Sequence, residues 1–243
     1  MRDEPHGELA EVLAGVARTL STTTTVQGTL DLIVALAVDV IPGADLAGFS
    51  LVSPGTIRTP SSNGPIVVEL DALQAELGEG PCLSAIAEHS TCYSPDLAAE
   101  LRWPRFAPAA ARLGMGSLLA DPLFVDDRVL GALNLYSRRV DAFDDADMAT
   151  AVLFSAHAAL ALSQAQTHAG EVELSRQLRE AIESRDVIGQ AKGILMEREH
   201  VDADTAFDML RRASQRLNVK LRDLAGRVAH ARDEDEAIPR GPS

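Results

Sequence analysis

The chain is poor in the residues that build metal centres and disulfide frameworks. Its 243 residues include only two cysteines, Cys82 and Cys92, and six histidines. Neither cysteine belongs to a CxxC motif, and the histidines form no HExxH or other zinc-ligand spacing. Two such cysteines are most simply explained as reduced, buried thiols of a cytosolic protein. We therefore expect no structural metal and no disulfide.

Catalytic motifs are lacking as well. The sequence contains no Walker A, GxSxG or GxGxxG pattern, and its acidic residues are spread as surface charge. We therefore expect a protein that is not an enzyme. No apolar run reaches the length of a membrane span, and residues 1–20 lack the basic start and apolar middle of a signal peptide. These absences predict a cytoplasmic location without membrane contact.

Basic residues are outnumbered and unevenly placed. The chain has 36 acidic residues against 22 Lys and Arg, a formal net charge of −14, which repels phosphates and argues against a general nucleic-acid coat protein. Residues 209–232 are the exception, because Asp223 is their single acid. The basic residues there are Arg211, Arg212, Arg216, Lys220, Arg222, Arg227 and Arg232. A local basic face on an acidic protein indicates site-specific binding.

Helix and strand signals alternate through the first two thirds of the chain. Apolar residues at helical spacing predict helices over residues 8–20, 26–40, 69–77, 82–89 and 104–113. Short apolar runs between turn residues predict strands over residues 45–52 and 91–93, and residues 117–125 and 129–136 predict an antiparallel hairpin. This order describes an α+β domain with an antiparallel sheet flanked by helices.

A nearly continuous helical signal follows, from residue 144 to about residue 199. Apolar residues in its second half recur at heptad-compatible steps: Leu174, Leu178, Ala181, Ile188 and Leu195. Arg185 and Lys192 occupy the two missing positions of this 4-3 pattern. The spacing predicts a coiled coil and therefore a dimer.

Two shorter helices are expected at the C-terminal end. An Asp202 cap predicts the start of the first and Asn218 its end. Its buried stripe is predicted at Ala206, Leu210, Ala213 and Leu217. Phe207 lies beside this stripe, where core packing is favoured over stacking on an unpaired RNA base. The apolar face of the last helix is predicted at Leu221, Leu224, Ala225 and Val228. Residues 233–243 are acidic and then rich in Pro and Gly, which predicts a disordered tail.

Two glycines interrupt the long helix. Gly189 and Gly193 each cost about 1 kcal/mol relative to alanine in a helix interior. Two explanations stay open: the last helix packs closely against the bare surface, or a phosphate strand approaches it while Arg185 and Lys192 supply charge. Together with Met196, these residues fall along one side of the helix.

The C-terminal segment resembles the ANTAR domain, a three-helix module that binds RNA as a transcription antiterminator. The resemblance is carried by Ser184-Arg185, Ile188, Gln190-Ala191-Lys192-Gly193, Leu195-Met196, Ala206-Phe207, Leu210-Arg211, Ser214-Gln215 and residues 221–225. It implies an RNA site at Arg185, Gly189, Lys192, Gly193, Met196, Arg211, Arg212, Gln215, Lys220 and Arg222. It also implies tandem hairpin loops as the ligand, one for each unit of a dimer. Without the resemblance, the arginine cluster would equally suit a helix-turn-helix on DNA.

The N-terminal part resembles a GAF domain of the kind that precedes ANTAR modules in actinobacterial regulators. The resemblance is carried by LDALQ with GEGPC in residues 70–82, by RWPRF in residues 102–106 and by GALNLY in residues 131–136. GAF domains bind cyclic nucleotides, tetrapyrroles, haem or other small molecules, and some bind nothing, so the cofactor stays unassigned. The pocket candidates are Cys82, Trp103, Phe106 and Tyr136. A buried thiol is favoured for Cys82 over a chromophore anchor or a redox sensor, because no neighbouring His or Lys is placed to lower its pKa.

The predicted organisation is a GAF sensor domain over residues 8–166, a coiled-coil joint with the ANTAR domain over residues 167–232, and the tail. The expected function is RNA-binding transcription antitermination under the control of an unknown small molecule or signal. No phospho-acceptor receiver pattern precedes the joint, so control by a ligand or partner is expected. The alternative is a GAF-led signalling scaffold whose C-terminal helices bind a protein partner.

Overall fold

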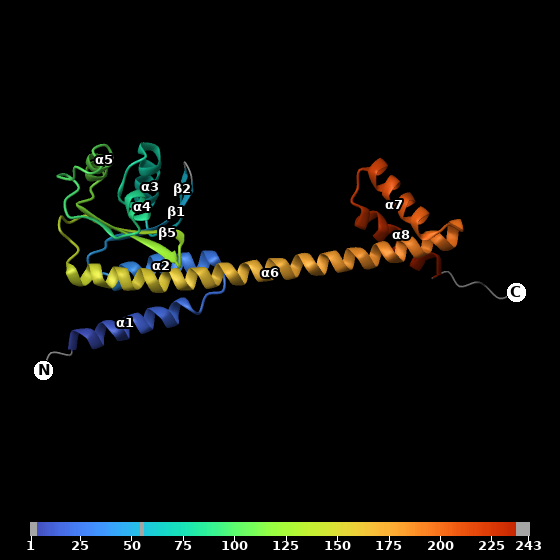
Figure 1. Cartoon of the computed structure of the whole chain (residues 1–243), viewed down its shortest axis with the longest axis horizontal. Helices are drawn as coiled ribbons and strands as arrows, with labels where there is room; N and C mark the ends of the chain where they lie inside the picture. The colour runs from blue at the N-terminus through green and yellow to red at the C-terminus, as the bar shows by residue number, and fades with distance from the viewer. Residues whose placement is uncertain (1–3, 54–55, 237–243) are drawn as a thin grey trace. The chain divides into compact units, whose positions relative to one another are not determined.

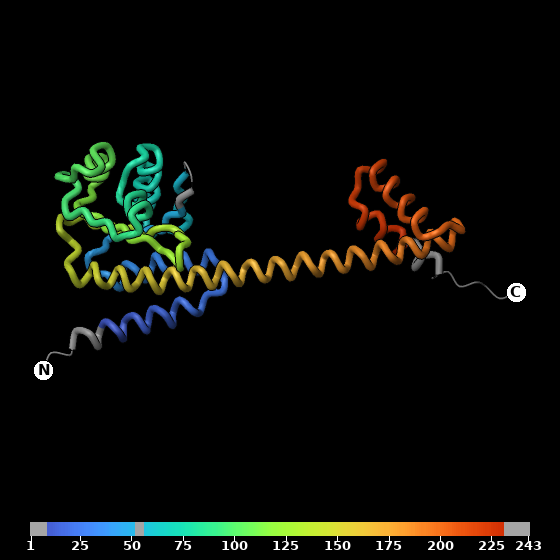
Figure 2. Tube along the Cα trace, viewed as in Figure 1, coloured from blue at the N-terminus to red at the C-terminus, as the bar shows by residue number. Residues whose placement is uncertain are grey.

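The computed structural model describes residues 4–53 and 56–236 of the chain. It divides into two compact units, Met1–Gly170 and Glu171–Ser243. Figure 2 traces the backbone of the chain.

The first unit is built on a five-stranded antiparallel sheet. Its strands are β1 (Leu46–Ser53), β2 (Thr56–Ser62), β3 (Cys92–Ser94), β4 (Ser117–Val125) and β5 (Arg128–Ser137), in the order β2-β1-β5-β4-β3. The predicted hairpin is confirmed as β4 and β5. The sequence prediction missed β2, because the segment TIRTPSS is polar and contains a proline, as edge strands often do.

Five helices of this unit are α1 (Glu4–Leu20), α2 (Val26–Val40), α3 (Pro65–Leu77), α4 (Pro81–Glu88) and α5 (Phe106–Arg112). The predicted bounds of α2 are confirmed, whereas α3 begins four residues before its predicted start. Pro65 is at the first helical position, where its fixed φ favours the helix and its missing N–H costs nothing.

Helices cover both faces of the sheet (Figure 1). On one face, side chains of α2 and of the start of α6 (Asp145–Glu199) form a core with Phe49, Leu119 and Leu133. On the other face, α3, α4 and α5 form a second core with Leu118 and Tyr136. Successive residues of a strand point to opposite faces, so β4 and β5 are buried on both sides and are apolar almost throughout.

Helix α6 runs without a break at Gly170, close to the predicted 144–199. One stretch of it is long and apolar enough, at a mean hydropathy of 1.3, to span a membrane by length and composition. This corrects the expectation that no apolar run reaches that length. It is weak evidence for a membrane, because Phe154, Ala158 and Leu162 of this helix are buried in the core of the first unit.

The second unit contains the end of α6, α7 (Ala203–Leu217) and α8 (Leu221–Glu236). The predicted caps are confirmed: the Asp202 carboxylate accepts a hydrogen bond from the Thr205 N–H at 2.8 Å, and Asn218 ends α7 in the left-handed conformation. The core consists of Ala191, Leu210 and Ala225, one residue from each helix, with partly buried apolar neighbours.

Two core predictions for this unit are wrong. Phe207 and Leu217 were expected in the core, but their side chains are 40% and 57% exposed. The buried stripe of α7 is narrow: within this helix, Ala206 and Leu210 are the buried residues. The other two helices cover only that side of α7. Helix α8 continues to Glu236, so it includes residues 233–236 of the predicted tail. The remainder of that tail, residues 237–243, lies outside the described residues.

Candidate functional site

Five of the predicted nucleic-acid residues lie on the side of α6 that faces away from the three-helix core. Ala191 of α6 is buried in the core that it forms with α7 and α8, and Ile194 is also buried. Arg185, Gly189 and Gly193 are exposed, Met196 is 36% exposed, and Lys192 is half-buried. At 3.6 residues per turn these positions fall opposite the buried ones. The structure therefore presents them together on one surface.

The two glycines of this surface have open space beside them. A Cβ added at Gly189 or Gly193 would meet no atom within 4 Å among the described residues. The explanation that the last helix of this chain packs closely against the glycines is therefore wrong. No contact within the described chain explains why the helix has glycines here, although they weaken it. The close approach of a ligand or of a second chain remains as the explanation.

Arg211, Arg212 and Gln215 are exposed on α7. The Arg211 guanidinium contacts the Asp208 carboxylate at 2.9 Å, and that of Arg212 lies 3.8 Å from the same carboxylate. Exposed ion pairs of this kind contribute only about 0–1 kcal/mol. Both arginines can thus exchange Asp208 for a phosphate at small cost.

An open groove of about 300 Å³ lies between the helices of the second unit. Its lining is mostly apolar, and two arginines of α7 belong to it: the residues are Leu195, Met209, Leu210, Arg212, Ala213, Arg216, Leu224 and Val228. Arg216 was not among the predicted site residues. Its position one helical turn after Arg212 was the available signal.

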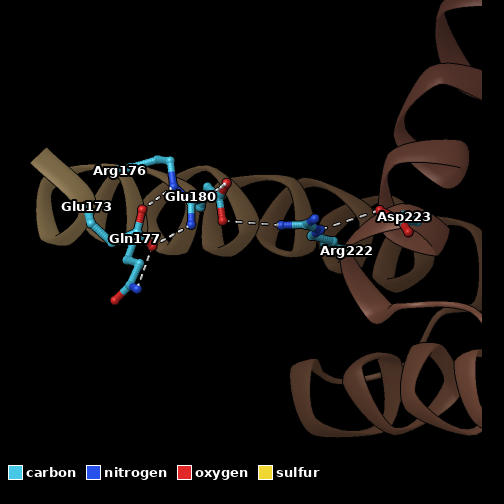
Figure 3. Close-up of polar contacts among 6 residues, drawn as sticks. All are labelled: Glu173, Arg176, Gln177, Glu180, Arg222 and Asp223. Atoms are coloured by element: carbon cyan, nitrogen blue, oxygen red, sulfur yellow. Dashed lines mark hydrogen bonds and ion pairs between the residues drawn. The ribbon is translucent and has the colours of Figure 1, made fainter. Parts of the chain in front are cut away.

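The remaining two predicted residues lie near the start of α8. Lys220 is exposed, and Arg222 contacts Asp223 at 3.5 Å and Glu180 of α6 at 3.9 Å (Figure 3). Glu180 also pairs with Arg176. Arg176 in turn donates a hydrogen bond to Glu173, which lowers the pKa of the Glu173 carboxyl to about 2. The ion pairs of Arg222 are also exposed and long, so Arg222 can exchange its carboxylates for a phosphate at small cost as well. The ten predicted residues thus lie at three places.

The first unit contains a buried polar cluster that the sequence analysis missed. The Asp71 carboxylate, 1% exposed, accepts hydrogen bonds from Ser50 Oγ at 2.5 Å and Thr59 Oγ1 at 2.7 Å. It also accepts from Asn134 Nδ2 and Tyr136 Oη, both at 3.0 Å. Burial raises the pKa of Asp71, while these four hydrogen bonds oppose the rise.

Comparisons with protein families identify both units. Residues 23–163 match the GAF domain model, and residues 176–228 match the ANTAR domain model. The chain belongs to the GAF family and carries an ANTAR domain after the GAF domain. Both are regulatory domains. The protein is therefore a regulator of the signal-sensing kind, and its output domain is of the RNA-binding type.

Solved structures share the GAF fold. A free methionine-R-sulfoxide reductase from Neisseria meningitidis, in complex with its substrate, is 21% identical, with a TM-score of 0.54 over 65% of this chain and 90% of that one. The GAF domain of a phosphoenolpyruvate-protein phosphotransferase from Coxiella burnetii is 16% identical, with a TM-score of 0.53 over 67% and 96%. At such identities the likeness shows the fold alone. No curated protein matches the chain.

The four pocket candidates of the GAF domain are all buried. Trp103, Phe106 and Tyr136 pack in the core beneath α3, α4 and α5, and Cys82 lies beside the Asp71 cluster. The indole N–H of Trp103 donates a hydrogen bond to Ser84 Oγ at 3.0 Å, which fixes the orientation of the ring. Burial raises the pKa of the Cys82 thiol to about 12. The expectation of free, buried thiols at Cys82 and Cys92 is confirmed.

Proposed function

We propose that this protein is a transcription antitermination regulator whose ANTAR domain binds hairpin RNA under the control of the GAF domain. The observation that carries the proposal is the glycine-lysine surface of α6. Gly189 and Gly193 leave open space beside Lys192, on the side of the helix that the three-helix core does not use. Removing two Cβ atoms lets a sugar-phosphate backbone approach closely, while Arg185 and Lys192 supply the charge.

Helix α7 offers further groups suited to RNA. Arg211 and Arg212 are held only by exposed ion pairs with Asp208. The exposed Phe207 ring can stack on an unpaired base, which hairpin loops provide and duplexes do not. Its exposure, contrary to the expected core position, supports RNA over duplex DNA.

We propose that the active species is a homodimer and that α6 carries the signal. Leu174, Leu178 and Ile182 are 57%, 56% and 61% exposed on α6. They lie on the side of the helix that continues into Arg185 and Lys192. A change at the GAF domain would alter the helix pair and with it the presentation of two ANTAR domains to tandem loops. The small molecule or signal that acts on the GAF domain is unassigned.

The test is binding of the full chain to a tandem-hairpin RNA, beside a duplex DNA of equal charge. The double variant Lys192→Ala, Arg212→Ala is expected to lose RNA affinity by about 100-fold or more, because two charge-assisted contacts contribute at least about 1.5 kcal/mol each. The dependence of log affinity on log salt should become shallower by about two. Binding is measured by fluorescence anisotropy over a salt series.

The matched control is Arg112→Ala, Arg138→Ala, which removes two exposed cations of the GAF domain and should leave RNA affinity unchanged. Equal losses in both double variants would assign the effect to net charge and contradict the site. A fragment of residues 171–232 separates a missing input signal from a missing activity. RNA binding by neither the full chain nor the fragment would overturn the proposal.

A second prediction concerns the glycines. Gly189→Ala and Gly193→Ala are each expected to raise the free energy of unfolding by about 1 kcal/mol, because the added Cβ meets no atom of the described chain. They should nevertheless weaken RNA binding, about tenfold or more, because the methyl groups occupy the surface that the backbone approaches. Chemical denaturation and anisotropy measure the two effects.

Gly170→Ala is the control for the glycine variants. It lies in the same helix and also has no atom within 4 Å of an added Cβ, so it should stabilise without changing RNA binding. A fall in stability at position 189 or 193 would show instead that a second chain packs over the glycines.

One observation favours a different function. The groove between the ANTAR helices is lined mainly by apolar side chains, as peptide-binding grooves are. If the C-terminal helices bind a protein partner, RNA affinity should be weak, insensitive to hairpin structure and unaffected by Arg212→Ala.

A further inference from the structure

A second cavity lies in the GAF domain, at the edge of the sheet. Strand β3 pairs with β4 only as far as the Cys92–Ala120 pair, and β4 continues beyond that pair to Val125. A hollow of about 190 Å³ opens there between β4, the segment before β3 and helix α6. It is lined by His89, Ser90, Thr91, Asp121, Pro122, Phe124, Val152, Ser155 and Ala156.

This cavity is separate from the Asp71 cluster. Side chains alternate along β4, so Asp121 points to the same face as Leu119 and Leu123. Those two leucines belong to the core that α2 and α6 cover. The Asp71 cluster contains Tyr136 and lies on the opposite face. The sheet itself therefore divides the two sites.

Two polar side chains are buried in the wall of the cavity. Asp121 is 4% exposed, and its carboxylate accepts a hydrogen bond from the Thr91 hydroxyl. Ser155 of α6 is 2% exposed, and its Oγ forms no hydrogen bond within the described chain. Burial raises the pKa of Asp121, while the hydrogen bond from Thr91 opposes the rise. An unpartnered hydroxyl beside a buried carboxylate is costly unless a further group completes the hydrogen bonds.

Two stacked rings and an exposed valine border the opening of the cavity. The rings of His89 and Phe124 stack with centroids 6.4 Å apart and planes 21° from parallel. Phe124 and Val152 are each 47% exposed. His89 holds this place through a left-handed backbone, with φ of 52°, that an ordinary residue adopts only at a cost.

We propose that this cavity binds a small organic cation, a protonated amine or amidine that carries a flat or short apolar group. The cationic head would meet Asp121 and donate to Ser155, and the apolar part would lie against Phe124 and Val152. A cavity of about 190 Å³ suits a compact ligand, because a cavity of about 150 Å³ can hold benzene. The chain's net charge of −14 also attracts cations.

The test is titration of the full chain with benzylamine. Calorimetry measures the affinity, and hydrogen exchange locates the bound ligand. Benzylamine is expected to bind saturably and at least tenfold more tightly than benzyl alcohol, which has the same shape without the charge. Added protection should appear in residues 119–125 and 150–157, which border the cavity. Asp121→Asn is expected to lower the affinity at least tenfold.

Two further variants keep the result interpretable. Ala156→Leu narrows the cavity from the exposed side of α6 without touching the carboxylate, and it should also weaken binding. Asp31→Asn removes an exposed carboxylate of α2 and should leave binding unchanged. Equal affinity for benzyl alcohol, unchanged binding in both cavity variants, or no saturable binding would each overturn the proposal. RNA binding is not needed for any of these readouts.

Discussion

The Asp71→Ala variant is expected to lose about 3 kcal/mol or more of the free energy of unfolding. Five side chains donate to this carboxylate in the interior of the GAF domain: Ser50, Thr59, Asn134, Tyr136 and, at a longer 3.4 Å, Gln74. Each buried donor left without an acceptor costs about 1–3 kcal/mol, and hydroxyl rotation can relieve only some of them. A domain typically has only about 5–15 kcal/mol of stability, so the loss should be evident in urea denaturation.

The matched control is Asp31→Ala. Asp31 also accepts two side-chain hydrogen bonds, from Gln27 and Ser61, but it is exposed, so water can replace it. Its loss should stay within about 1 kcal/mol. Similar losses for the two variants would contradict the central role of the Asp71 cluster.

The same carboxyl predicts a pH dependence. Because burial raises the pKa of Asp71 in the folded state, the folded protein holds this proton more tightly than the unfolded chain. Its contribution to stability is therefore fully present below the unfolded pKa, about 3.9, and is lost as the pH rises through the folded pKa. Asp71→Asn does not titrate there. The stability of the native chain relative to Asp71→Asn should fall over that window, and a rise would contradict the assignment.

Leu174→Glu together with Leu178→Glu is expected to convert the proposed dimer into a monomer. These exposed leucines follow each other by one helical turn on α6, and no contact within the described chain explains them. Two buried charges at a helix seam cost far more than a weak interface supplies. Sedimentation or light scattering measures the change, and tandem-hairpin affinity should fall with it because the two RNA sites are no longer linked.

Val172→Glu is the control for the dimer. Val172 is 56% exposed on the same helix but lies off the stripe of Leu174 and Leu178. It should leave the dimer intact. A native chain that is already monomeric at working concentration would contradict the dimer, and RNA binding by that monomer would leave the ANTAR assignment standing.

Local sequence patterns determined much of this protein. The bounds of α2, the β4 and β5 hairpin, the unbroken α6 and the caps at Asp202 and Asn218 all follow from residues within a few positions of one another. Periodicity and capping act over one or two turns, so they can be recognised without a fold. The family motifs extended this to the domain order.

Only the tertiary structure revealed the two sites of the GAF domain. The Asp71 cluster joins side chains from β1, β2, α3 and β5, and the second cavity joins β4 to α6 across residues 89–156. No local rule predicts such meetings, because they depend on which strands pair and which helix covers them. The same holds for β2, whose polar sequence becomes a strand only beside β1, and for Phe207, whose exposure depends on how little of α7 its neighbours cover.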